Sequence, residues 1–245
     1  GIMHNSKAWP EFLPSIETTA YISNLDANEL GSYWPYNMNN IAWEWVTNNI
    51  RDGIVKEAKG IFKFSAEDIS NIIKREKSPE KPNEPPIPDS AIDATINIEN
   101  AKLSYVEHFP NVNNVNTSVH FTGHAMDATV ESGAILNKKI NNARVKFNNL
   151  WHHNLPISIS GDFKGNAQDL VPFLKTSYME KPNSEELASI YNISGEVSGN
   201  IDLTIPIISN LKYDDIDIKI AADFRNVILP GLLNGKNVSG INLAF

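Results

Sequence analysis

Polar and apolar residues alternate along most of the second half of the chain. The clearest segments are AIDATINIE from residue 91, LPISISG from 155, NIDLTIPII from 200 and DDIDIKIAADF from 214. A period of two places the apolar residues on one face of a β-strand, which is typical of a sheet buried on one side only. Such sheets favour antiparallel pairing. The pattern therefore predicts a mainly β, antiparallel fold.

The first part of the chain mixes strands with short helices. IETTAYISNLDANEL, from residue 16, predicts a strand followed by a turn or the start of a helix, and IVKEAKGIFKF, from 54, predicts a second strand. SAEDISNIIKREK predicts a helix in which Ser65 and Asp68 form a capping box. Between the two strands, apolar spacing predicts a helix that includes Ile41 and Asn49, and we expect Gly53 to end it.

A proline-rich segment follows the predicted capped helix. SPEKPNEPPIPDS, residues 78–90, contains five prolines and several charges, so it fits neither a helix nor an inner strand and is expected to be a surface loop or linker. It divides the chain into an N-terminal β-α-β-α segment (1–77), this loop (78–90) and a β-rich segment (91–245). One helical insertion, at about 167–191, interrupts the β-rich segment.

Short sequence echoes recur along the predicted strands. ISISGDFKGN, which ends at Asn166, and YNISGEVSGN, which ends at Asn200, share I-S-G-x-x-x-G-N. ENAKLSY and NNARVKF, around Ala101 and Ala143, share N-A-[KR]-[LV]-x-[FY]. The echoes indicate either a repeating β-hairpin unit or only the common statistics of glycine turns and strands.

Composition excludes several classes of function. The formal net charge is -8 and no basic stripe is present, so nucleic acid is not an expected partner. The chain has no cysteine, which removes disulfides, thiol catalysis and thiolate zinc sites. No apolar run reaches 18 residues and the N-terminus lacks a signal-peptide core. Both ends resemble cuts, so we expect a fragment whose membrane anchor or targeting segment lies outside it.

No catalytic or metal-binding constellation stands out. Histidines lie four apart or side by side without a partner pattern for a metal, so surface histidines are favoured. Acidic pairs are conceivable as glycosidase carboxylates, but their surroundings do not single them out. We therefore expect no enzyme activity, no cofactor and no metal. The residues considered are His120, His124, His152, His153, Asp127, Glu131, Glu185, Glu186, Asp214 and Asp215.

Three of the five tryptophans lie in one stretch, GSYWPYNMNNIAWEWVTNNIRDG, which runs from Gly31 to Gly53. They are Trp34, Trp43 and Trp45. The favoured interpretation is an aromatic cluster on a short helix that packs over an edge or mouth of the sheet. Contact with lipid or a membrane, and a sugar-stacking platform, are the alternatives.

Several stretches together resemble one protein family. GSYWPYNMNNIAWEWVTNNIRDGIVKEAKG, NAKLSYVEHFPNVNNVNTSVHFTGHAMDATVESGAI, LPISISGDFKGNAQDLVPFLKTSYME and ISGEVSGNIDLTIPI occur in this order between residues 31 and 207. They resemble motifs of the AsmA-like family, specifically its YhdP-type central region. One departure is that this chain has Trp43 where the family often has an arginine.

The resemblance implies a fold, a location and partners. It implies an elongated, twisted antiparallel sheet that forms a U-shaped groove, with a few short helices at its edge or mouth. It also implies a periplasmic protein of a Gram-negative bacterium, held to the inner membrane by an N-terminal helix absent from this chain. Its groove would shield phospholipid acyl chains during transport between inner and outer membrane, with possible outer-membrane or envelope protein partners.

The apolar strand faces supply the candidate groove residues. Two other interpretations remain: a structural or interaction module of the envelope that carries no lipid, and, more distantly, a hydrolytic β-protein. The candidates for contact with acyl chains are Ile96, Ile98, Val119, Phe121, Ile157, Ile159, Ile201, Leu203, Ile205, Ile218 and Ile220.

Overall fold

The architecture is that of a computed structural model of the chain. It describes residues 13–33, 47–78, 82–104, 111–135, 138–152, 155–171, 192–206, 208, 211, 215–233 and 236–244. Trp34, Trp43 and Trp45, with most of the predicted insertion at 167–191, lie outside these residues.

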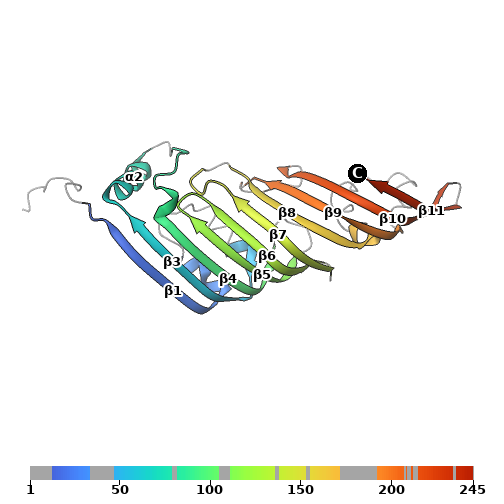
Figure 1. Cartoon of the computed structure of the whole chain (residues 1–245), viewed down its shortest axis with the longest axis horizontal. Helices are drawn as coiled ribbons and strands as arrows, with labels where there is room; N and C mark the ends of the chain where they lie inside the picture. Colours follow the sequence, from blue (N-terminus) through green and yellow to red (C-terminus); the bar gives the residue numbers. More distant parts are fainter. Residues whose placement is uncertain are drawn as a thin grey trace, which may run out of the picture.

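The described chain forms one open antiparallel sheet of 11 strands. The strands follow sequence order from β1 to β11, except that the short β2 pairs with β4. Figure 1 shows them side by side along the long axis, with β1 at one end and β11 at the other. The strands are β1 (Ile16–Asp26), β2 (Ile50–Arg51), β3 (Ile54–Phe64), β4 (Ile92–Leu103), β5 (Val112–Thr122), β6 (Met126–Ile135), β7 (Lys138–Phe147), β8 (Ile157–Asn166), β9 (Ser194–Ile205), β10 (Asp217–Leu233) and β11 (Lys236–Ala244).

The predicted fold class is confirmed. The alternating segments form β4, β8, β9 and β10, and IVKEAKGIFKF forms β3 with the same bounds. Each of these strands turns its alternate polar residues to the outer face. Ion pairs link neighbouring strands there, including Lys63–Glu17 at 2.9 Å between β3 and β1 and Lys146–Asp127 at 3.6 Å between β7 and β6.

Short helices lie at the ends of the strands. The 3₁₀-helix η1 (Ala27–Tyr33) follows β1, and the α-helix α2 (Ala66–Lys77) follows β3. The predicted capping box of α2 is confirmed, because the Asp68 backbone N–H donates to Ser65 Oγ and the Ser65 N–H donates to the Asp68 carboxylate. Two further 3₁₀-helices, η2 (Asp89–Ala91) and η3 (Ala167–Leu170), precede β4 and follow β8.

The described part of the proline-rich segment is packed against the sheet. Ile87 is buried with Ala91 and Ile92. The Asp89 carboxylate accepts a hydrogen bond of 2.6 Å from the Thr122 hydroxyl and one of 3.1 Å from the His124 backbone N–H. The strands before and after this segment, β3 and β4, pair with each other, so one sheet continues across it.

The role predicted for Gly53 is wrong. Residues 47–49 are helical, but Ile50 and Arg51 already form β2, so the helix ends before the glycine. Gly53 instead lies in the turn from β2 to β3 with a φ of 81°. A Cβ there would lie 2.7 Å from the Ala101 Cα. Close backbone approach, and not helix termination, therefore explains the glycine.

The asparagines that end the echoes ISISGDFKGN and YNISGEVSGN occupy different positions. Asn166, which ends the first, caps η3 through its side chain, which accepts a hydrogen bond from the Gln168 N–H. Asn200, which ends the second, lies inside β9 and pairs with Asp162 and Ala221. The shared asparagine therefore stands at a strand end in one case and inside a strand in the other.

The Asp89 contacts predict a pH-dependent stability. The Thr122 hydroxyl bond, aided by His124, lowers the pKa of Asp89 below 3.8, against partial desolvation. A depressed folded-state pKa stabilises the fold above the unfolded-state pKa, and the contribution is lost as the pH falls through the folded-state pKa. Asp89→Asn should therefore lower the free energy of unfolding at pH 7 by a few tenths of a kcal/mol, because the site is exposed.

Denaturant unfolding of both proteins from pH 7 to about pH 3 tests this expectation. The difference between wild type and Asp89→Asn should shrink below about pH 4, the ordinary range of an aspartate. A difference that stays constant over that range would contradict a stabilising charge at Asp89.

Candidate functional site

One face of the sheet carries an uninterrupted row of apolar side chains. In the antiparallel registers, each member of the row stands directly opposite the next, so all of them point to the same face. We call this the middle row; it crosses nine strands, β1 and β3 to β10. Its members are Ile22, Ala58, Ile96, Val119, Ala128, Val145, Ile159, Leu203 and Ile218.

Two flanking rows widen this apolar face. Towards α2, the second row runs through Ala20, Gly60, Ala94, Phe121, Met126 and Phe147 and resumes at Ile157 and Ile205. Towards η1, the third row runs through Leu25, Val55, Ile98, Thr117, Val130 and Ala143 and resumes at Ile201 and Ile220. Threonine is the one hydroxyl residue in these three rows.

The face is hollowed between β1 and β7 into a cavity of about 390 Å³. We call it the apolar groove. Its described lining includes the members of the three rows on β1 and β3 to β6, with Val145 of β7. Leu30 and Tyr33 of η1, Ile50 of β2 and Leu150 after β7 also line it, together with Phe62, Ile92, Ala101, Leu103 and Val115 from the same strands. Small residues lie between large ones, and a Cβ at Gly60 would lie 2.6 Å from the Phe62 ring. Small side chains on the floor therefore give the groove part of its depth.

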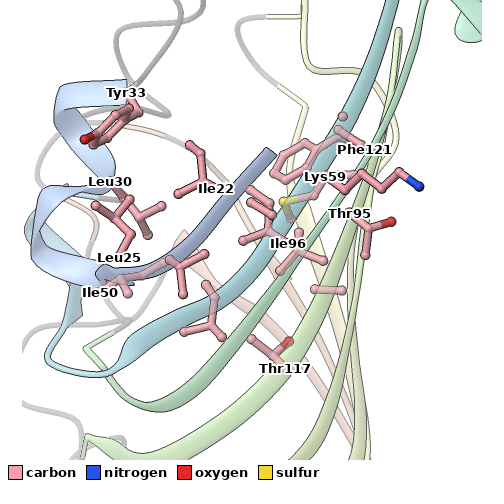
Figure 2. A pocket seen from close by; sticks show the side chains of 18 of the residues that line it. Ile22, Leu25, Leu30, Tyr33, Ile50, Lys59, Thr95, Ile96, Thr117 and Phe121 are labelled. Atoms are coloured by element: carbon pink, nitrogen blue, oxygen red, sulfur yellow. The ribbon is translucent and has the colours of Figure 1, made fainter. Parts of the chain in front are cut away.

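Figure 2 shows how the groove is built. The strands curve around Ile22, Ile96 and Phe121, while Leu30 and Tyr33 approach from η1 on the opposite side. Lys59 and Thr95, which also border the groove, point away from it. Lys59 is the one charged residue among the described lining residues. Because it points away, the inner surface of the groove is almost entirely hydrocarbon.

The α2 end of the strands is closed by a second apolar cluster. Ile87, Ala91 and Ile92 are buried there, with Phe121 and Trp151 packed against them. The Trp151 indole N–H donates to the Gly123 carbonyl at 2.7 Å. These contacts fix the side of the groove that lies beneath the proline-rich segment.

Arg75 of α2 anchors this closure. Its side chain is 6% exposed, lies 5.4 Å from the centre of the Trp151 ring, and donates through Nη2 to the Trp151 carbonyl at 2.5 Å. Burial lowers the pKa of Arg75, an effect that nearby Glu76 partly offsets. The guanidinium stays charged at neutral pH. It therefore holds α2 against the segment after β7 that contains Trp151, through a charged hydrogen bond and a cation–π contact.

All the predicted groove residues lie on the three rows. Four of them line the groove, and two continue on β8 in a cluster around Phe147 that shares Met126, Val145 and Leu150 with it. The other five extend the face over β9 and β10, where Ile220 is 52% exposed. Contact of these residues with acyl chains stays a prediction. The three groups are Ile96, Ile98, Val119 and Phe121; Ile157 and Ile159; and Ile201, Leu203, Ile205, Ile218 and Ile220.

The sequence pattern missed the groove residues of β1 and β3. Val55 and Ala58 both face the groove although they are three residues apart, because an extra residue at Lys56 shifts the pairing with β4. Strict alternation hides them for that reason. The apolar residues still alternate on each side of Lys56, and these two alternating segments are the sequence signal that could have located the groove residues.

Three of the residues considered for chemistry have structural partners, whereas His153, Glu185, Glu186 and Asp214 lie outside the described residues. His120 Nε2 lies 2.9 Å from Asp93 Oδ1, and His124 Nε2 lies 2.7 Å from the Ile87 carbonyl oxygen. Asp127 is paired with Lys146 on the outer face. Within the described ranges, no three histidine or acidic side chains are placed to hold a metal ion. Nor is any helix of those ranges long and apolar enough to cross a membrane.

Comparison with known families decides the classification. The family model described as YhdP protein matches residues 4–226. The chain belongs to the YhdP protein family. This AsmA-like family is one of bacterial envelope proteins and is of a transport type, not an enzymatic one. No curated protein and no solved structure matches the chain.

A charge placed in the middle row should weaken binding of apolar ligands. Ile96→Glu would put a carboxylate into the groove, whereas Thr95→Glu, one residue earlier on β4, would place it on the outer face between Lys59 and His120. We expect Ile96→Glu to weaken binding of a fluorescent apolar probe by about tenfold, or roughly 1.4 kcal/mol.

Thr95→Glu is the matched control and should bind the probe like the wild type. Fluorescence titration of the three proteins measures the difference. Equal affinities for the two glutamate variants would mean that the probe does not enter the groove.

Proposed function

We propose that this chain is a segment of a periplasmic protein whose apolar groove covers phospholipid acyl chains during transport between the inner and outer membranes. The observation that carries the proposal is the middle row, which stays apolar from β1 to β10. In the full-length protein, an N-terminal helix outside this chain would provide attachment to the inner membrane. Envelope proteins at either end are the expected partners.

The length of the row fits a lipid that moves along it. Eight inter-strand spacings of about 4.8 Å give a row of about 38 Å. One leaflet of a bilayer core, which a phospholipid acyl chain spans in the membrane, is about 15 Å thick. A chain lying along the row would therefore occupy less than half of it, with equivalent apolar positions ahead and behind.

The energetics favour holding a lipid without fixing its position. Each CH₂ group removed from water contributes about 0.8 kcal/mol, so ten covered groups contribute about 8 kcal/mol. This attraction is non-directional, so it does not hold an acyl chain at any one strand of the rows. A lipid can therefore slide from strand to strand while its head group stays in water.

Lipid that co-purifies with the chain tests the proposal. After expression in the bacterial envelope, native mass spectrometry and lipid extraction should detect bound phospholipid. Ile159→Glu should lower the bound amount several-fold, because it places a charge in the middle row on β8. Ser158→Glu is the matched control: Ser158 is exposed on the outer face and stands opposite Lys146.

Two results would count against the proposal. Wild-type protein free of lipid would favour a structural or interaction module of the envelope. Equal lipid content in Ile159→Glu and Ser158→Glu would place any bound lipid away from the groove.

A further inference from the structure

Five asparagines in the strands share an uncommon backbone conformation. All have φ between 52° and 57°, in the left-handed region, and all have exposed side chains. Residues other than glycine rarely adopt this region, and asparagine is one of the few that tolerate it. Since none of the five is buried, the backbone conformation explains the residue type. They are Asn24, Asn100, Asn114, Asn142 and Asn226.

Four of these asparagines lie at β-bulges. At each one, two residues of the asparagine's strand face a single residue of a neighbour: in β4 at Asn100, β5 at Asn114, β7 at Asn142 and β10 at Asn226. A bulge bends its strand and increases the local twist. Bulges in four strands of one sheet therefore bend it repeatedly along the same side.

A glycine lies against each of the four bulges. At three bulges the glycine is itself the single facing residue, and a Cβ there would crowd the bulged strand. At Asn100 the facing residue is Asn116, and Gly53 approaches Ala101 from the turn between β2 and β3. A Cβ placed on each glycine would lie 3.3 Å or less from a neighbouring atom: Gly53 to Ala101 Cα 2.7 Å, Gly133 to Val112 Cγ1 3.1 Å, Gly161 to Ala143 Cβ 3.3 Å and Gly195 to Val227 Cα 2.9 Å.

Each bulge turns the next residue into the apolar face. In β4, Ile96 and Ile98 face the groove, and after the extra residue Ala101 and Leu103 face it as well. The residues that follow four of the asparagines are among the most buried in the described chain. Their exposed fractions are Leu25 9%, Ala101 4%, Val115 5% and Val227 2%.

The buried residues that follow the asparagines lie in the deepest part of the groove. Leu25, Ala101 and Val115 form one buried cluster with Val55 and Ile98, whereas Val119 and Ile96 of the middle row are only half-buried. The sequence echo around Ala101 and Ala143 thus has a structural cause, because each N-A pair is a bulge asparagine and the residue it turns inwards.

We infer that this line of asparagine bulges and adjacent glycines, here called the crease, sets the depth of the groove and so how much of an acyl chain it covers. Asn100, Asn114, Asn142 and Asn226 are positioning residues that need not touch the lipid. The lipid part of this inference rests on the proposed function, and the geometric part does not.

Deletion of Asn114 removes one bulge of the crease without changing how the strands pair. β5 has one extra residue, Asn114, in its pairing with β4 and in its pairing with β6. Without it, Val112 would still pair with Leu103 and Ile135, and Val115 with Ala101. All apolar residues of β5 would keep their facing. The deletion removes the bend and leaves the registers unchanged.

The experiment reads groove depth and lipid binding separately in the complete 245-residue chain. The chain has no cysteine, so Val115→Cys gives a single thiol at the crease and Val119→Cys a reference thiol in the middle row. Deletion of Asn114 should speed maleimide modification of the first thiol several-fold and leave the second unchanged. It should also lower binding of phosphatidylethanolamine that carries a fluorophore on one acyl chain.

Asn114→Gly is the conservative variant, because glycine adopts the left-handed region readily; it should restore both readouts. Asn114→Val, whose branched side chain resists that region, should act like the deletion and replaces it if the deletion does not fold. Unchanged modification of the crease thiol, or unchanged lipid binding by a flattened groove, would overturn the inference. Wild-type protein that binds no lipid would instead reject the proposed function, while thiol modification would still decide whether the crease shapes the groove.

Discussion

A sheet with one apolar face is stable in water only if that face is covered, and this requirement governs the rest of the structure. The polar face needs no cover, and ion pairs such as Lys63–Glu17 link its neighbouring strands. The apolar face runs over nine strands, yet the described helices are short and lie at the ends of strands. The chain meets the requirement partly by curving, so that apolar side chains of β1 to β7 cover one another around a groove.

Curvature and closure come from different devices on the two sides of the groove. On one side, bulges at asparagines fold the strand ends and bury the residues that follow them. On the other side, α2 and the proline-rich segment are fixed by Arg75, Trp151 and Asp89. The first device is repeated in several strands, whereas the second occurs at β3 to β7. A repeated device can build a groove of any length, which suits the proposed role of covering a lipid over a distance.

Local pattern predicted much of this fold from the sequence. Alternation located β4, β8, β9 and β10, and the capping box located the start of α2, because both signals depend only on neighbours in the chain. Pattern also placed the candidate groove residues on one face. The family resemblance, carried by motifs between residues 31 and 207, supplied the expectation of a groove.

Signals that depend on a partner strand were not predictable in the same way. Gly53 looked like a helix stop, but its role is set by the backbone of Ala101, which lies on another strand. The phase shifts at Lys56 and Asn114 look like broken alternation until the facing strands are known. Bulges are therefore where the sequence pattern is weakest, and they are also where the groove takes its shape.

Photo-cross-linking tests most directly the claim that lipid travels along the middle row. A photoreactive phenylalanine analogue would replace Val119, Val145 or Leu203 in turn, and Ser118, Lys146 or Asp202 as neighbours on the outer face. On illumination in living cells, the account predicts phospholipid adducts at all three row positions and none at their neighbours. Adducts at neither set, or equally at both, would contradict it.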